Sequence, residues 1–93
     1  MNQAIAGTLE SSDIQITLKY HDEDKNIIEL ESQVKHLFGD EILRVINRVL
    51  DQHQLKGIHV RAIDKGALNC TIKARMQTAI YRLTESEINW EVL

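Results

Sequence analysis

Apolar side chains fall on every second position of the segment 13–20, and the residues between them are polar. Successive side chains of an extended chain point to opposite faces, so this period of two places Ile14, Ile16, Leu18 and Tyr20 on one face. The pattern predicts a strand with one buried face and one wet face, which requires a sheet and a covering layer.

A second strand is expected just before this one. The segment 4–9 is a short apolar run, and the polar residues 10–13 that follow it have the composition of a tight turn. We therefore predict that 4–9 and 13–20 form a β-hairpin with its tip at Ser11 and Ser12.

The period changes to that of a helix in the middle of the chain. Apolar residues recur at intervals of three and four from Phe38 to Leu50, which predicts an amphipathic helix with Ile46 in its buried stripe. Asp40 and Glu41 stand near the expected beginning of this helix, where the positive end of the helix dipole favours acidic side chains.

Three more elements complete the expected order. Short alternating runs predict strands at 27–34 and 58–63. The alternation around Cys70 allows a short strand, but the length of the apolar stripe favours a helix over 69–83, with Asn69 as its N-cap. The order β-β-β-α-β-α predicts a small α+β fold in which two helices pack on one face of a mostly antiparallel sheet.

The segment 84–93 is expected to be a C-terminal tail. A polar break is followed by an apolar end without a period, which includes the single tryptophan, Trp90. Two interpretations stay open. Trp90 packs over the second helix and completes the core, because a small domain needs every large apolar side chain. Alternatively, the tail docks onto a partner protein, since tryptophan is frequent among residues that anchor interfaces.

Length and charge exclude several classes of protein. The 93 residues form one expected domain, 1–93, with 11 basic and 14 acidic side chains, and the net charge of −3 argues against a general nucleic-acid binder. No apolar run approaches the ~18 residues that cross a bilayer, and the beginning of the chain lacks the features of a secretory signal. With one unpaired cysteine, the chain is expected to be cytoplasmic and free of membranes.

No set of residues matches a catalytic or metal-binding pattern. The four histidines have no zinc-binding spacing, and the acidic run 22–24 lacks the glycine and the final glutamate of a calcium loop. Cys70 has no assignable base, so we interpret it as a buried or idle thiol. A serine at a hairpin tip is ordinarily a turn residue. The residues alone therefore indicate a domain that is not an enzyme.

Several motifs nevertheless resemble the acyl carrier protein family of citrate lyase, the gamma subunit of that complex. The run 6–13, AGTLESSD, is similar to the N-terminal motif of the family. The similarity continues with the triplet 38–40 (FGD), with Gly57 at the beginning of a strand, and with 64–68 (DKGAL) followed by Arg75. These landmarks span nearly the whole chain in the order that the family has.

The resemblance implies a covalent carrier that performs no catalysis itself. A serine of the family's N-terminal motif bears 2'-(5''-phosphoribosyl)-3'-dephospho-CoA through a phosphodiester, attached by a prosthetic-group transferase. The thiol at the end of this arm carries an acetyl thioester. The alpha subunit of citrate lyase exchanges acetyl for citryl and releases acetate. The beta subunit then cleaves the citryl carrier to oxaloacetate and the acetyl carrier.

The family serine directly follows a glutamate, which places the attachment at Ser11. Many members have glycine after that serine, whereas this chain has Ser12, which is therefore a competing acceptor. Glu10 and Asp13 flank the position, and their charges are expected to discourage an anionic arm from lying on its own domain. Two alternatives stay open: the carrier of a related malonate decarboxylase-type complex, and an adaptor or regulatory module without any modification.

Overall fold

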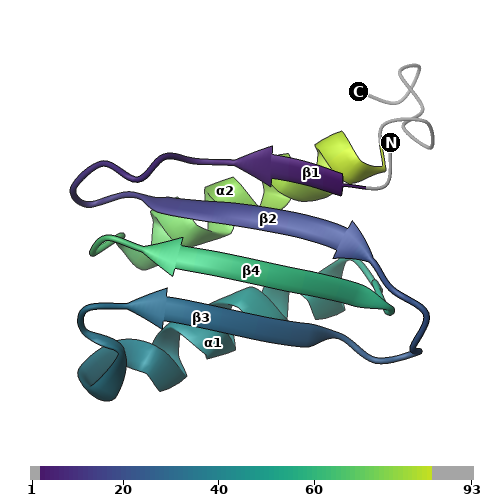
Figure 1. Ribbon diagram of the computed structural model, residues 1–93, viewed down its shortest axis with the longest axis horizontal. Coiled ribbons are helices and arrows are strands. Elements are labelled where there is room, and N and C mark those ends of the chain that lie inside the picture. Colours follow the sequence, from purple (N-terminus) through teal and green to yellow (C-terminus); the bar gives the residue numbers. More distant parts are fainter. Residues whose placement is uncertain (1–2, 85–93) are drawn as a thin grey trace.

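Four strands form one mixed sheet, and two helices cover one of its faces in the computed structural model, which describes residues 3–84 (Figure 1). The elements along the chain are β1 (Gln3–Ala6), β2 (Ile14–Tyr20), β3 (Ile27–Ser32), α1 (Lys35–Gln52), β4 (Ile58–Asp64) and α2 (Asn69–Leu83). The predicted α+β class and element order are confirmed. The predictions made for Trp90 and the rest of the tail beyond Thr84 lie outside the described residues.

The strands lie in the order β1-β2-β4-β3, with β4 inserted between β2 and β3. β1 pairs with β2 and β2 with β4 in antiparallel fashion, whereas β3 and β4 are parallel and are joined through α1. The register sets Ile14 opposite Asp64 and Ser32 opposite Asp64. The beginning of β2 and the ends of β3 and β4 therefore meet at one edge of the sheet.

The core lies between the sheet and the two helices. Ile14, Ile16 and Leu18 of β2 are fully buried, as the period of two predicts, and Ile46 of α1 and Met76 of α2 are fully buried against them. Tyr20, the fourth apolar residue of the alternation, is exposed because β2 ends there. Neither helix among residues 3–84 is long and apolar enough to cross a membrane.

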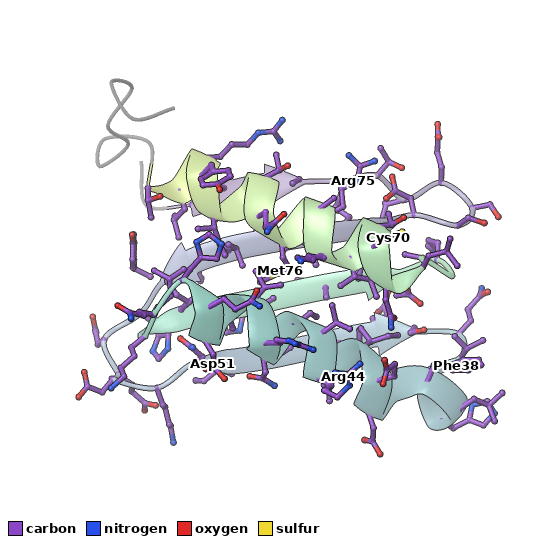
Figure 2. The ribbon with its side chains drawn as sticks, turned by 180° about the vertical axis from the view of Figure 1, so that it is seen from behind. Phe38, Arg44, Asp51, Cys70, Arg75 and Met76 are labelled. Carbon is purple, nitrogen blue, oxygen red and sulfur yellow. The ribbon has the colours of Figure 1, made fainter. Side chains whose placement is uncertain are left out.

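α1 begins earlier than the apolar pattern predicts. Its first residue is Lys35, directly after the short turn that follows β3, so Asp40 and Glu41 are not in the first turn and that expectation is wrong. Phe38 was expected on the buried face but is 55% exposed. It lies where the helix extends past the ends of the strands and there is no sheet beneath it (Figure 2).

α2 has the predicted bounds, 69–83, but its beginning differs from the prediction. Leu68 occupies the N-cap position without a side-chain hydrogen bond, and Asn69 is the first helical residue. The Asn69 amide instead donates to the carboxylate of Glu41 at 2.8 Å, which joins the two helices. Cys70 is exposed, so its thiol is not buried, and of the two interpretations only that of an idle thiol stays a prediction.

Candidate functional site

The connection between β1 and β2, residues 7–13, contains the candidate attachment site, and we call it the serine loop. The backbone N–H of Asp13 donates to the carbonyl of Glu10 at 3.1 Å, which closes a turn with Ser11 and Ser12 at its two central positions. Both serines are exposed. The loop therefore presents two hydroxyl groups at the tip of the hairpin.

Ser12 has a backbone conformation that favours glycine. Its φ is +67°, and a turn with a positive φ at its second central position ordinarily has glycine or asparagine there. The N–H of Ser12 donates to the carbonyl of Lys65 at 2.8 Å, so a contact with another loop holds this conformation. Ser12 therefore carries backbone strain that glycine would not.

Gly7 fixes the path of the chain into the serine loop. Its φ is +88°, and a Cβ atom there would lie 1.8 Å from the carbonyl oxygen of Ile14. No side chain fits at that distance, so only glycine allows the loop to pass so close to the beginning of β2. This turn also ends β1 at Ala6, short of the predicted strand 4–9.

The side chain of Asp13 organises the serine loop from inside. It is buried, and its carboxylate accepts hydrogen bonds from the N–H and hydroxyl of Thr8, at 3.1 and 2.6 Å, and from the N–H of Ile14 at 2.7 Å. The guanidinium of Arg75 on α2 donates two more, from Nε at 3.1 Å and Nη2 at 2.9 Å. One side chain thus joins both ends of the loop to the helix behind it.

These bonds favour the charged form of the carboxyl group. The hydrogen bonds from Arg75, and after them that from Thr8, hold the pKa of Asp13 well below its usual range. The pKa of Arg75 is raised in turn, chiefly by its hydrogen bond to Asp13. The negative charge of Asp13 is therefore compensated within the domain. Because Asp13 is buried and paired with Arg75, the repulsion expected between Asp13 and an anionic arm is weakened, and Glu10 is the exposed acidic side chain of the serine loop.

A second loop, the β4–α2 loop at 65–68, is bonded to the serine loop. The N–H of Lys65 donates to the carbonyl of Asp13 at 2.8 Å, and the Lys65 carbonyl accepts the bond from Ser12. The buried carboxylate of Asp64 accepts from the hydroxyl of Ser32 at 2.9 Å and from the N–H of Ala67 at 3.0 Å. The ends of three strands and both loops are thus fixed to one another.

The motifs that carry the family resemblance converge on this edge of the sheet. The segments 6–13 and 64–68 form the two bonded loops, Arg75 reaches them from α2, and the triplet 38–40 lies in the early turns of α1 at the same end of the molecule (Figures 1 and 2). Gly57 is the exception, since it supports the turn at the other end of β4.

Sequence reasoning missed two features of this end. One is the contact between Asp13 and Arg75. The sequence indicated it only in that both residues belong to the motifs that resemble the carrier family. The other is an apolar rim of four large exposed side chains: Leu9 (52%), Leu37 (68%), Phe38 (55%) and Leu68 (70%). Within residues 3–84, no group of three or more histidine, cysteine or acidic side chains is placed to hold a metal ion.

Comparison with known proteins gives the family. Residues 1–83 match the acyl carrier family model described as the malonate decarboxylase delta subunit (MdcD). The citrate lyase acyl carrier protein of Oenococcus oeni is 52% identical, over 97% of this chain and 94% of the relative. That of Lactiplantibacillus plantarum is also 52% identical, over 97% and 94%. The chain belongs to the citrate lyase acyl carrier protein family.

A solved structure supports the fold of this carrier family. A chain in the crystal structure of a Pseudomonas malonate decarboxylase hetero-tetramer in complex with malonate has a TM-score of 0.73. The similarity covers 88% of this chain and 84% of that chain at 15% sequence identity. At that identity the likeness concerns the fold alone.

The Asp13–Arg75 pair predicts a pH-dependent stability. Asp13→Asn should lower the free energy of unfolding at pH 7 by about 2–3 kcal/mol, because an amide cannot accept all the hydrogen bonds that the buried carboxylate accepts. The pKa of Asp13 is lowered in the folded protein, so this contribution is complete above the unfolded pKa of about 3.9 and is lost as the pH falls. Urea unfolding from pH 7 to pH 2 measures it.

The matched control for this prediction is Asp24→Asn, which changes an exposed turn carboxylate in the same way. The difference in stability between wild type and Asp13→Asn should be constant from pH 7 down to about pH 4 and should shrink between pH 4 and pH 2, while Asp24→Asn stays within about 0.5 kcal/mol throughout. A difference that is as large at pH 2 as at pH 7, or one as small as that of Asp24→Asn at pH 7, would show that the ion pair does not hold the loop.

The strain at Ser12 predicts that glycine stabilises the domain. Ser12→Gly should raise the free energy of unfolding by about 0.5–1 kcal/mol, because the relief of the left-handed backbone exceeds the added entropy of the unfolded chain. Ser12→Ala, which keeps the Cβ atom, should give no such gain. Urea unfolding of the three proteins tests this, and a loss of stability in Ser12→Gly contradicts the role of the positive φ.

Proposed function

We propose that the chain is the carrier subunit of citrate lyase in the cytoplasm and that Ser11 bears 2'-(5''-phosphoribosyl)-3'-dephospho-CoA. The observation that carries the proposal is an exposed serine at the tip of a loop fixed from behind by Asp13 and Arg75, in a chain of the citrate lyase acyl carrier family. The arm supplies the thiol that forms the acyl thioester. The chain supplies the hydroxyl and holds it outside the domain.

Ser11 fits the attachment better than Ser12 does. Within the part of the chain that the structure describes, no hydrogen bond holds Ser11, so its esterification leaves the contacts of the loop intact. The backbone of Ser12 is strained and bonded to Lys65, and a bulky group on that residue adds crowding where the two loops meet. The order of the motif, in which the serine follows Glu10, supports the same choice.

A tethered thiol explains how a domain that performs no catalysis can contribute to the reaction. Attachment to a short flexible arm presents the acyl group to each partner active site at an effective concentration of roughly millimolar order. The alpha subunit would exchange acetyl for citryl on this thiol, and the beta subunit would cleave the citryl thioester. The fixed serine loop sets the point from which the arm swings.

The apolar rim supports a docking role for the same end of the molecule. Four large apolar side chains are exposed at this end of the molecule, and exposed apolar surface of this kind commonly belongs to a site that binds another protein. Leu9 lies in the serine loop and Leu68 in the β4–α2 loop, while Leu37 and Phe38 lie in the first turns of α1. We propose that the alpha and beta subunits and the prosthetic-group transferase contact this rim when they reach for Ser11 or its arm.

A second candidate function is the carrier of a malonate decarboxylase-type complex. The description of the matching family model favours it. The relatives at 52% identity are named for citrate lyase, whereas the malonate decarboxylase chain is 15% identical and shares the fold. Citrate lyase is therefore the better supported of the two. Co-expression with each set of large subunits separates them by which set co-purifies.

If Ser11 is the attachment site, only the substitution of Ser11 should prevent the gain in mass that the arm causes. When the chain is co-expressed with the prosthetic-group transferase and the enzymes that supply its substrate, wild type and Ser12→Ala should gain the mass of the arm, and Ser11→Ala should not. Peptide mass spectrometry locates the adduct. An adduct on Ser12 alone, or one that Ser11→Ala keeps, overturns the assignment, and an unmodified wild type favours the adaptor interpretation.

The apolar rim predicts weaker partner binding without loss of stability. Phe38→Ser and Leu68→Ser should each weaken binding to the large subunits by about tenfold or more, as truncation of an interface anchor does. Because both side chains are exposed, the unfolding midpoint should hardly move. Isothermal titration measures the affinity.

Tyr20→Ser is the matched control for the rim, since Tyr20 is a similarly exposed aromatic residue at the far end of β2, roughly 20 Å from the serine loop. It should bind the large subunits as wild type does. Equal effects of Phe38→Ser and Tyr20→Ser would show that the rim is not the docking surface.

A further inference from the structure

A groove of about 330 Å³ runs between α1 and α2 on the helix side of the molecule. Three cationic side chains contribute to its lining, Arg44 and Arg48 from α1 and Lys73 from α2, and the lining contains no acidic side chain. Val45 and Val49 supply its apolar part. A basic groove is unexpected on a chain whose net charge is −3.

The three cationic side chains of the groove differ in whether an acidic side chain neutralises their charge. Arg44 is paired with Glu41, whose pKa is lowered to about 2, chiefly by the hydrogen bond from Arg44. Arg48 and Lys73 are exposed, and neither forms an ion pair with any residue of the segment 3–84. The groove therefore carries a surplus of about two positive charges, which favours an anionic ligand.

The groove opens close to the serine loop. Asn69, which lines it, follows Lys65 by four residues, which span at most about 14 Å, and Lys65 is hydrogen-bonded to Ser12. The near end of the groove thus lies within roughly 20 Å of Ser11. Figure 2 shows Arg44 on α1 and Cys70 on α2 toward the end of the molecule that holds the two loops.

We propose that the groove binds the diphosphate of the arm on Ser11 and holds the arm against its own domain between acyl transfers. This inference rests on the proposed attachment. The diphosphate stands about a dozen bonds from the serine oxygen, on the order of 15 Å when extended, which is comparable with the upper bound of roughly 20 Å between Ser11 and the near end of the groove. Guanidinium and ammonium groups are the usual partners of phosphate oxygens.

The energetics require only weak binding. Because the arm is tethered, its effective concentration at the groove is of millimolar order, and a site with a Kd in that range is then substantially occupied. The repulsion expected from Asp13 opposes this position only weakly, since Arg75 compensates that charge. Glu10 is the one exposed acidic side chain of the serine loop.

The first test uses the unmodified domain, so it does not depend on attachment. Inorganic pyrophosphate and dephospho-CoA are titrated separately while backbone amide shifts are recorded. Both should bind and shift the amides of Arg48 and Lys73, and the double variant Arg48→Gln/Lys73→Gln should bind at least tenfold more weakly. The matched control, Lys19→Gln/Arg61→Gln, removes two exposed charges from the sheet side and should bind as wild type does.

The second test uses the modified protein and reads the groove through Cys70, the single cysteine of the chain. Alkylation of Cys70 by neutral iodoacetamide should be several-fold slower with the arm attached than without it. In the modified Arg48→Gln/Lys73→Gln protein it should return to the rate of the unmodified domain. Peptide mass spectrometry separates Cys70 from the thiol of the arm.

Two results overturn the inference: pyrophosphate binding that the double variant keeps, and equal alkylation rates with and without the arm. If a double variant that keeps pyrophosphate binding also fails to bind the large subunits, the groove is a protein-docking surface. None of these touches the attachment itself, which the mass of the wild-type and Ser11→Ala proteins decides separately.

Discussion

The hydrogen-bonded pair of Asp13 and Arg75 is the contact on which the candidate site depends. An exposed loop loses on the order of 1–2 kcal/mol of backbone entropy for each residue that is fixed, so a serine at its tip stays in place only if something behind it holds the chain. A buried carboxylate is costly unless its oxygens are bonded, and here both oxygens of Asp13 accept several donors. Arg75 stays 39% exposed, which keeps part of its hydration. The pair therefore fixes the loop at little cost in desolvation.

Strand order explains why these parts meet. Because β4 lies between β2 and β3, antiparallel to the first and parallel to the second, the beginning of one strand and the ends of two others share an edge. Asp13 and Asp64 stand at that edge, and each accepts hydrogen bonds from the loop that follows or precedes its strand. The exposed serines lie on a loop that is hydrogen-bonded to the β4–α2 loop and to α2, and the apolar rim lies at the same end of the molecule. The proposed attachment site and the proposed resting site thus belong to one small domain.

The hydrophobic periodicity of the sequence predicted the strands and helices whose buried face is set by neighbouring residues. The alternation through Ile14 and Ile16 identified β2 and its buried face, and the apolar stripe with Met76 gave α2 its bounds. The exposure of Phe38 could not be read from the helical period, because the period does not say where the sheet beneath the helix ends. The Asp13–Arg75 contact joins residues 62 positions apart, and such a pairing leaves no periodic signal. The hairpin tip was predictable from its polar turn, while the strain at Ser12 depends on a bond to another loop.

The proposed attachment and the proposed resting site together require that the arm can be both held and released. A resting site that binds the tethered diphosphate with a small preference lowers the fraction of free arm, and a partner must then overcome that preference. Solvent-exposed cations such as Arg48 and Lys73 contribute little each, since water and salt screen them. The proposed docking on the apolar rim would bury several large side chains and gain more, at about 25 cal/mol per Å² of apolar surface. The free energy of partner docking would exceed that of diphosphate binding, so the arm would leave the groove when a partner binds. A rigid serine loop and a weakly binding basic groove are therefore compatible within one domain.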